Sequence, residues 1–243
     1  MSTEFSHDQY ALAYPDGVEH HWWNRARSWI ILRLLKLYSR PGDAVMEVGC
    51  GRGVEVMSLQ RAGMAIHGVE LAPVAPLAPV AECVATGMDA KDVSASLRAE
   101  TRVLLLLDVL EHIPEPASFL RQLLAHYANV TTVIVTVPAR QELWSNYDEF
   151  YGHQCRYSIE SLRALGDEAG LSTVSTGYFF QMLYPPARLL SLLGRERGLE
   201  IKPPSRATRG LHGLVAGLFQ LEHALMPRRV RGSSAYGVFA VET

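Results

Sequence analysis

The chain is poor in cysteine and has no long apolar run, and both deficits narrow the class of protein. Its three cysteines, Cys50, Cys83 and Cys155, include no C-x-x-C pair, which argues against a disulfide framework and against a structural zinc site. No stretch reaches the roughly 18 apolar residues that a membrane-spanning helix needs. Residues 1–14 also lack the apolar segment of a secretory signal peptide. We therefore expect a cytoplasmic protein without a metal site.

The chain also has little net charge. It contains 23 basic and 25 acidic side chains, which give a formal charge of −2. This balance gives no reason to expect a nucleic-acid partner. With 243 residues, 48% of them apolar and 20% charged, the chain has the composition of an ordinary globular protein, and we expect a single domain over residues 1–243. The charge is unevenly spread, since residues 188–231 carry a net +6 and the remainder carries −8.

Short apolar strands alternate with amphipathic helices along most of the chain. The patterns predict strands at 44–48, 65–69, 103–109, 132–137, 172–180 and 236–241, and helices at 22–38, 54–62, 115–128 and 158–169. This alternation favours a mostly parallel sheet with helices on both faces. In such a sheet, ligands bind at the carboxyl ends of the strands, and the motifs described next fall at predicted strand ends.

Two segments depart from the alternation. Residues 71–80 contain Pro73, Pro76 and Pro79, a spacing that argues against a regular helix there. Residues 181–235 form a long insertion before the last strand, and part of it has helical periodicity. One helical face of that part carries Leu211, Leu214, Val215, Leu218, Leu221 and Leu225.

A glycine-rich loop between a strand and a helix carries the first functional signal. The sequence from Glu47 to Gly53 reads E-V-G-C-G-R-G, with three glycines at alternate positions. Glycines in this arrangement allow a sharp turn and a close approach of the backbone to a ligand. The third glycine comes one residue earlier than in the dinucleotide-binding pattern G-x-G-x-x-G. Taken alone, the loop is also compatible with a tight turn that binds nothing.

Four motifs in this order resemble those of class I S-adenosylmethionine-dependent methyltransferases, in the branch of the type 11 and type 23 methyltransferase domains. The first is the glycine loop, and the second is Glu70 at the end of the following strand. The third is Asp89 within G-M-D-A, and the fourth is the segment D-V-L-E-H-I from Asp108 to Ile113. The resemblance covers residues 20–180 and the last strand. It implies a Rossmann-like three-layer sandwich with about seven strands, the last of them antiparallel.

The resemblance implies S-adenosyl-L-methionine as the cofactor and S-adenosyl-L-homocysteine as its product. The carboxylate of Glu70 would accept hydrogen bonds from the ribose hydroxyls, and Asp89 would lie beside the adenine amino group. The full set of cofactor-binding residues that it implies is Glu47, Gly49, Cys50, Gly51, Gly53, Glu70, Leu71, Asp89, Ala90, Asp108, Val109 and His112.

Several of these positions have a structural alternative. Asp108 lies at the end of an apolar run, where it would either contact the cofactor or brace the glycine loop. His112 is compatible with a hydrogen-bonding role at the entry of a helix, and Cys50 is expected there because it is small. Met88 is inserted into the family's usual G-D-A pattern, and this departure is an argument against the adenine contact of Asp89.

A second group of chemically active side chains follows the strand predicted at 132–137. Asp148, His153 and Tyr157 fall in a segment that resembles the acceptor-binding stretch of one branch of these enzymes. We expect these three residues to act in catalysis, because an oxygen acceptor has to lose a proton and histidine has a suitable intrinsic pKa. The alternative is that His153 and Tyr157 only hold the loop against the following helix.

Two segments outside these motifs are expected to cover the ligands. The aromatic and basic segment around Trp22 and Trp23 resembles the opening helix of this branch, here residues 20–40. Both tryptophans are compatible with stacking on a ligand and with ordinary packing of the helix against the sheet. The insertion at 181–235 is expected to lie over the acceptor cleft as a lid. Its basic part, 188–231, is equally compatible with peripheral contact to an anionic membrane, with a homodimer interface and with a solvated surface.

The sequence thus predicts methyl transfer to an oxygen of a small-molecule, sugar or lipid-linked acceptor, in the cytoplasm or at the inner face of a membrane. One alternative is a catalytically silent protein that binds an S-adenosyl ligand or acts as a scaffold. The other is an NAD-dependent oxidoreductase. Glu70 would suit that ribose too, but the glycine spacing and the segment from Asp108 to Ile113 do not.

Overall fold

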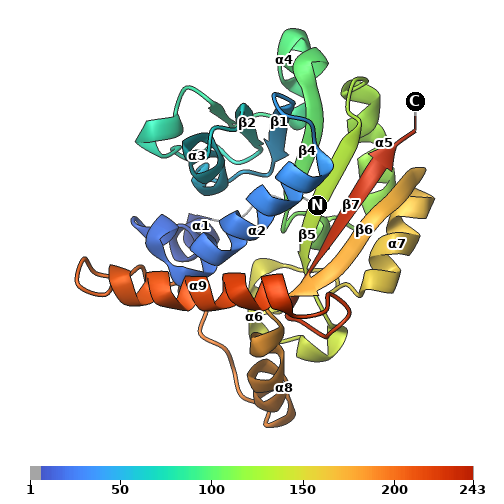
Figure 1. Ribbon diagram of the computed structural model, residues 1–243. Helices are drawn as coiled ribbons and strands as arrows, with labels where there is room; N and C mark the ends of the chain where they lie inside the picture. The colour runs from blue at the N-terminus through green and yellow to red at the C-terminus, as the bar shows by residue number, and fades with distance from the viewer. Residues whose placement is uncertain (1–6, 243) are drawn as a thin grey trace.

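A computed structural model describes residues 7–242, which form a seven-stranded sheet with helices on both faces (Figure 1). The strands are β1 (Ala44–Val48), β2 (Ile66–Glu70), β3 (Val84–Thr86), β4 (Thr101–Leu107), β5 (Thr132–Pro138), β6 (Leu171–Phe179) and β7 (Ser234–Val241). The α-helices in the described part of the chain are α1 (His7–Ala13), α2 (Trp22–Tyr38), α3 (Val54–Arg61), α4 (Ala95–Glu100), α5 (Pro116–His126), α6 (Asn146–Tyr151), α7 (Ile159–Glu168), α8 (Tyr184–Leu192) and α9 (Arg209–Leu225).

The strand order β3-β2-β1-β4-β5-β7-β6 is that of a Rossmann-like sheet. The pairs β1–β2, β1–β4, β2–β3 and β4–β5 are parallel, whereas β7 lies antiparallel between β5 and β6. The predicted three-layer sandwich with an antiparallel last strand is therefore confirmed. The chain runs outward from β1 to β3 and then returns to β4 beside β1, so the switch point, where ligands bind in such sheets, lies between β1 and β4.

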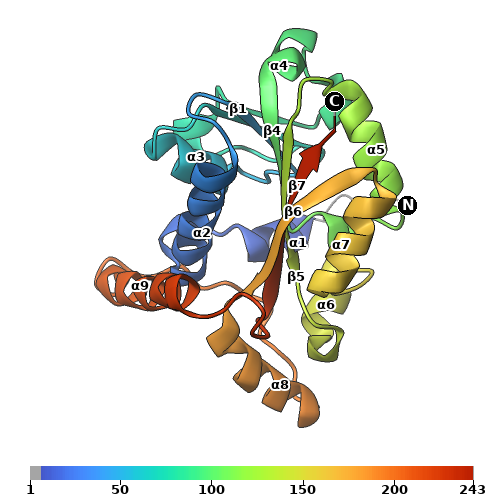
Figure 2. The ribbon, with the colours of Figure 1, turned by 45° about the vertical axis from the view of Figure 1, so that its right-hand side comes forward.

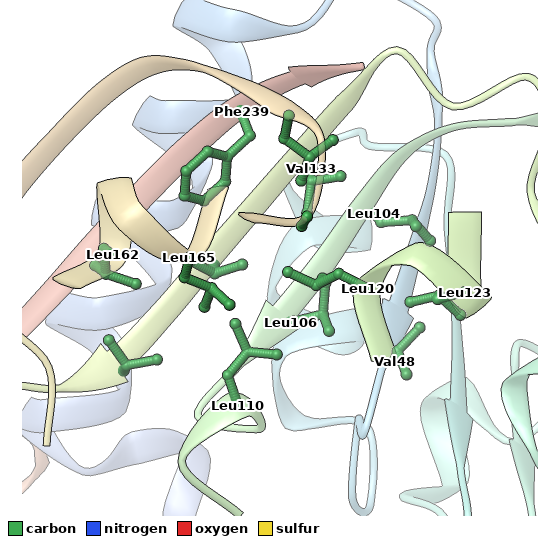
Figure 3. Packing of buried hydrophobic residues seen from close by; sticks show 14 of the residues in the cluster. Val48, Leu104, Leu106, Leu110, Leu120, Leu123, Val133, Leu162, Leu165 and Phe239 are labelled. Atoms are coloured by element: carbon green, nitrogen blue, oxygen red, sulfur yellow. The ribbon is translucent and has the colours of Figure 1, made fainter. Parts of the chain in front are cut away.

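The central strand β4 is apolar on both faces because helices cover both sides of it. Leu104 and Leu106 pack in one cluster with Leu120 of α5 and Leu165 of α7 (Figure 3). Leu105, between them in the sequence, belongs to the cluster on the opposite face, together with residues of α2 and α3. The two helical layers are separated by the sheet in Figure 2.

The sequence located six of the seven strands, and the missing one is β3. This strand has three residues, which are too few for a periodicity to be recognised. The helices α1, α4 and α6 have six or seven residues each and were not predicted for the same reason. Residues 71–80 contain only a 3-10 turn at Ala78–Val80, as their prolines predict. β4 ends two residues earlier than predicted, because Asp108 has a left-handed φ of 58°.

The insertion at 181–235 contains α8 and α9, joined by a long loop. α9 packs across α2, and Ala216 and Phe219 are its buried apolar side chains. The five leucines of the predicted α9 face are exposed, while Val215 is partly buried against the core. Within residues 7–242, no helix combines the length and the apolar character that crossing a membrane requires.

Candidate active site

A cavity of about 860 Å³ opens at the carboxyl ends of β1, β2 and β4, where the predicted motifs meet. Side chains from α1, α2, α6 and α8 complete its wall. Of the second group singled out in the sequence, His153 lines the same cavity, whereas Asp148 and Tyr157 are not among its lining residues. Eight of the twelve predicted cofactor residues line this cavity, namely Gly49, Glu70, Leu71, Asp89, Ala90, Asp108, Val109 and His112.

The other four predicted cofactor residues are not among the described residues that line the cavity: Glu47, Cys50, Gly51 and Gly53. The N–H of Gly51 donates to Oε2 of Glu70 at 2.8 Å, and Gly53 begins α3 with a φ of 81°. Glu47 is buried, and burial together with the charge of Glu55 raises its pKa to about 8. These residues shape the loop, and the structure does not bring their side chains into the cavity.

Cys50 is tightly packed, in keeping with the expectation that it is there because it is small. It is buried, and a Cβ added to Gly68 of β2 would lie 2.6 Å from its Sγ. Burial raises the pKa of its thiol, so the sulfur stays neutral. Cys50 therefore serves the contact between the glycine loop and β2.

Glycine is required at two points of the loop. A Cβ on Gly49 would lie 2.7 Å from Cγ2 of Val109, and a Cβ on Gly51 would lie 2.6 Å from Cζ of Tyr14. Both glycines also have positive φ, which side chains disfavour. Tyr14 follows α1, so the end of this helix lies next to the glycine loop, and both line the cavity.

The carboxylate of Glu70 is held in place at the end of β2. Its Oε2 accepts from the N–H of Gly51 at 2.8 Å, and its Oε1 accepts from the N–H of Ala72 at 3.0 Å. The hydroxyl of Tyr10 forms a further hydrogen bond with it. Two backbone donors fix the position of the carboxylate, which lies at the cavity wall and keeps acceptor capacity beyond those two bonds.

Asp89 lies at the same wall but is engaged by its own turn. Its Oδ1 accepts from the N–H of Lys91 at 3.0 Å, and Nζ of Lys91 lies 3.2 Å from Oδ2. Asp89 therefore caps the short turn at Ala90–Asp92. Met88 lines the cavity next to it, so the inserted residue is part of the wall.

Asp108 is paired with Arg27, an arginine of α2 that the sequence did not single out for function. Nη2 of Arg27 lies 2.8 Å from Oδ2 of Asp108, and Oγ1 of Thr136 donates to Oδ1 at 3.3 Å. The Arg27 side chain is only 11% exposed, and its guanidinium lies over the ring of Trp23 at 4.9 Å. Asp108 thus braces the ends of β4 and β5 against α2, and it lines the cavity as well.

The acceptor-side group is organised around Asp148, which is fully buried. Nδ1 of His153 lies 2.8 Å from its Oδ1, and Nε of Arg156 donates to the same oxygen at 2.8 Å. Burial alone would raise the pKa of Asp148, but the bond to His153 and the charge of Arg156 outweigh it and lower the pKa to about 2. The other oxygen accepts from the N–H of Ser145, which closes a capping box at the start of α6.

His112 stands beside His153, with the two rings edge to face at 4.8 Å. Burial and the neighbouring His153 lower the pKa of His112 to about 4, so it is neutral at neutral pH. It forms hydrogen bonds with the backbone of Tyr151 and Gly152. These hydrogen bonds support a structural role for His112. Its ring also lines the cavity, so a contact with the cofactor stays a prediction.

Glu111 completes a group that offers metal-ligand chemistry. One atom each from Glu111, His112 and His153 lies within 4.8 Å of the others. Imidazole nitrogens and carboxylate oxygens are common ligands of divalent metals. Burial and the charge of Asp108 raise the pKa of Glu111 well above its usual range.

The structure does not bring Tyr157 into the cavity. Its hydroxyl donates to the carbonyl of Leu110 at 3.1 Å, and the side chain is buried in the core. Burial raises the pKa of the hydroxyl, so it stays protonated and is not available as a base. Tyr157 holds its loop against the turn that follows β4, a structural role, although the hydroxyl contacts this turn and not the following helix.

The tryptophans of α2 combine packing with a place at the cavity. Trp22 stacks on Phe219 of α9 at 4.9 Å, and Trp23 lies 6.0 Å from the ring of Phe180. Both also line the cavity. Tyr10, Tyr14 and Arg27 are among the wall residues that sequence reasoning missed, because nothing in their spacing distinguished them from ordinary helix positions.

The glycine loop after β1, the acidic residue that ends β2 and the strand order together define a Rossmann-like methyltransferase. Residues 20–176 match the methyltransferase domain family, and the chain belongs to that family. The match includes the glycine loop, Glu70, Asp89, the segment from Asp108 to Ile113 and the Asp148–His153 pair.

Curated relatives include ubiquinone biosynthesis O-methyltransferases. The protein from Pseudomonas entomophila is 29% identical over an alignment of 136 residues that covers 47% of this chain and 56% of the relative. The protein from Pseudomonas aeruginosa is 30% identical over 132 residues, with the same coverage. The chain thus spans about half the length of the curated relatives it matches.

Two solved structures share the fold at low identity. The plantazolicin methyltransferase BamL, crystallised with a desmethyl plantazolicin analogue and S-adenosylhomocysteine, has a TM-score of 0.56 at 13% identity, covering 97% of this chain and 89% of its own. Magnesium protoporphyrin IX methyltransferase from Synechocystis PCC 6803, with bound S-adenosylhomocysteine, has a TM-score of 0.51 at 15% identity, covering 97% and 93%.

Proposed function

We propose that this protein transfers a methyl group from S-adenosyl-L-methionine to a hydroxyl oxygen of its acceptor. The observation that carries the proposal is that Glu70, at the end of β2, and His153, after β5, line one cavity. The first suits a ribose diol, and the second suits a hydroxyl that has to lose its proton. Family membership supports the same reaction class.

The residues at the strand ends fit an S-adenosyl ligand. Glu70 is a fixed carboxylate whose oxygens would accept from the two ribose hydroxyls, one of which would take the place of the Tyr10 hydroxyl. Gly49 would bring a backbone without a side chain to the methionine end, and Leu71 and Met88 would offer apolar contact to the adenine. When bound, the cofactor supplies an electrophilic methyl group on a sulfonium.

Asp148 and His153 form the acceptor-side pair in this proposal. An ionised carboxylate can only accept hydrogen bonds, so Nδ1 of His153 is the donor and its Nε2 is the nitrogen that can take a proton. The hydroxyl oxygen of the acceptor gains the methyl group and gives its proton to Nε2. Asp148 is a positioning residue, because it is buried behind the histidine and is held by Arg156.

The acceptor would be a small molecule or a sugar-linked or lipid-linked hydroxyl compound. The names of the curated relatives support oxygen as the acceptor atom and a lipid-soluble molecule as a reasonable class. The wall of the cavity supports apolar acceptors too, because Leu143, Leu183, Pro186 and Leu190 contribute to it.

The test is a product assay with purified protein, S-adenosyl-L-methionine and a panel of phenols, catechols, sugars and prenylated phenols. Formation of S-adenosyl-L-homocysteine together with a methyl ether, identified by mass spectrometry, supports the proposal. A product methylated on nitrogen or carbon would refute oxygen as the acceptor atom. Binding of S-adenosyl-L-homocysteine without turnover across the whole panel would favour a silent ligand-binding protein.

A further inference from the structure

The exposed large apolar side chains are concentrated in one part of the molecule. Eleven of the fourteen that the described residues expose lie between Met182 and Val230, on or beside α8 and α9. The largest fractions belong to Leu214 at 75%, Leu225 at 73% and Leu192 at 66%. Isolated exposed leucines need no explanation, but a cluster of this size marks a contact surface.

On α9 the exposed leucines form one stripe: Leu211, Leu214, Leu218, Leu221 and Leu225. The spacing of three and four residues places them on the same side of the helix. A different side of α9 is buried, where Ala216 and Phe219 join the cluster of α2. Because that packing fixes the rotation of α9, the leucine stripe faces away from the protein.

α8 carries a second exposed group that reaches the cavity. Leu189, Leu192 and Leu193 are each more than half exposed. On the same helix, Ala187 and Leu190 line the cavity. α8 therefore lies between the cavity and solvent, and its outer side is apolar.

Basic side chains follow the leucine stripe of α9 in the sequence. The loop that follows α9 contains Arg229 and Arg231, which line a shallow cavity of about 340 Å³ together with Arg140 and Arg163. Glu160 is the acidic residue in that wall, and Glu142 pairs with Arg140 at 2.6 Å, so four arginines against two carboxylates still leave a positive excess. The whole segment from 188 to 231 has a net charge of +6 in a chain of net charge −2.

Figures 1 and 2 place α8 and α9 at the same end of the molecule, the end at which the parallel strands terminate. We propose that the exposed leucines of α8 and α9, with the arginines of the following loop, form a docking surface for an anionic lipid bilayer. The leucines would enter the boundary between headgroups and acyl chains, and the arginines would contact lipid phosphates. Docking in this way would bring the α8 side of the cavity to the membrane.

Charge favours a lipid surface over a second copy of the chain. In a two-fold dimer, this surface would face itself and would set one positive segment against another. An anionic bilayer instead complements the arginines and accepts the leucines, and it requires no matching shape. The proposal concerns binding alone, so it stands or falls independently of methyl transfer.

The experiment is flotation of the full chain with phosphatidylcholine vesicles, with and without phosphatidylglycerol, at low and high salt. The wild type should float only with the anionic vesicles, and salt should weaken the binding. The double variant Leu214→Gln/Leu225→Gln should lose about tenfold or more in vesicle affinity, because each exposed leucine contributes through burial of its side chain. Arg229→Gln/Arg231→Gln should bind more weakly and show less salt dependence.

Leu37→Gln is the matched control, because Leu37 is 56% exposed on α2, outside this surface, and its variant should bind as the wild type does. Failure of the wild type to float with anionic vesicles would overturn the proposal. So would equal flotation of Leu214→Gln/Leu225→Gln, or a concentration-dependent dimer in sedimentation that this double variant abolishes. Calorimetry with S-adenosyl-L-homocysteine on the same preparations shows whether the cofactor site is intact, which separates the two proposals.

Discussion

Nδ1 of His153 lies 2.8 Å from Oδ1 of Asp148, and Nε of Arg156 donates to that same oxygen. One buried carboxylate thus orients a cavity-facing histidine and is itself held ionised by an arginine. This arrangement fixes which nitrogen of His153 carries the proton, and it is the basis of the first prediction.

His153→Ala should lower kcat by about 10²- to 10⁴-fold, the usual contribution of a general base, while leaving the affinity for S-adenosyl-L-homocysteine nearly unchanged. Steady-state kinetics and calorimetry measure the two effects separately. His126→Ala on the exposed end of α5 is the matched control. Turnover that survives the loss of His153 would remove it as the base, and inhibition of the wild type by a chelator would point instead to a metal at Glu111, His112 and His153.

The pairing of Arg27 with Asp108 should be energetically coupled. Asp108→Asn removes the charge beside a largely buried guanidinium, so we expect the free energy of unfolding to fall by about 1–3 kcal/mol. Arg27→Met and the double variant complete a cycle whose interaction free energy should be about 0.5–3 kcal/mol, measured by urea denaturation.

The same cycle decides between the two roles of Asp108. If Asp108 only braces the site, both single variants should weaken S-adenosyl-L-homocysteine binding by a similar factor. A much larger loss of affinity in Asp108→Asn than in Arg27→Met would assign it a direct contact with the cofactor. An interaction free energy near zero would show that the pair does not stabilise the protein.

Gly51→Ala should damage the cofactor loop. The new Cβ would lie 2.6 Å from Cζ of Tyr14 at a residue with a φ of 53°, so both the contact and the backbone oppose it. We expect a loss of S-adenosyl-L-homocysteine affinity together with a lower Tm. Gly63→Ala is the matched control, because Gly63 also has a positive φ but has nothing within 4 Å of a Cβ, and it should cost only about 1 kcal/mol. Equal effects of the two substitutions would show that the contact with Tyr14 is unimportant.

His223 should make the protein less stable in acid. Burial and the charges of Arg228 and Arg33 lower its pKa to about 4, and within the described residues neither ring nitrogen has a hydrogen-bond partner. An unfolded histidine binds its proton near pH 6.5, so the unfolded state binds more protons between about pH 6.5 and 4. The free energy of unfolding should therefore fall as the pH falls through that range.

The variant His223→Phe should show a smaller acid loss, by at most about 3 kcal/mol on the scale of 1.36 kcal/mol per pKa unit. His21 and His112 have lowered pKa values too, so the loss should shrink but not vanish. Urea denaturation at about pH 7 and about pH 4.5 measures it. An unchanged pH dependence in His223→Phe would contradict the assignment.

Much of the fold could be predicted because its signals are local. The apolar run of β4 and the helical spacing of α2 identify buried elements from a few neighbouring residues. The three residues of β3 carry no such signal, because their place depends on pairing with β2. The sequence showed that the leucines of α9 share one face of a helix. It did not show that this face is exposed, because that depends on which side of α9 packs against α2.

The candidate site was predictable where a motif fixes the backbone and less so where side chains meet across the fold. Glu70 and Asp108 were found because they belong to motifs at the carboxyl ends of β2 and β4, the edge of the sheet where ligands bind. Arg27 was missed because its role depends on Asp108, a residue far away in the sequence. Tyr157 has the residue type and spacing of a catalytic residue, but its hydroxyl is engaged by the carbonyl of Leu110.

Titration calorimetry with S-adenosyl-L-homocysteine tests the central claim most directly, with Glu70→Ala and the exposed control Glu82→Ala measured in parallel. The account predicts micromolar binding to the wild type and to Glu82→Ala. Binding to Glu70→Ala should be about tenfold to a hundredfold weaker, because hydrogen bonds to a charged group are lost. Absence of binding to the wild type, or equal affinity in Glu70→Ala, would contradict the assignment of this cavity to the cofactor.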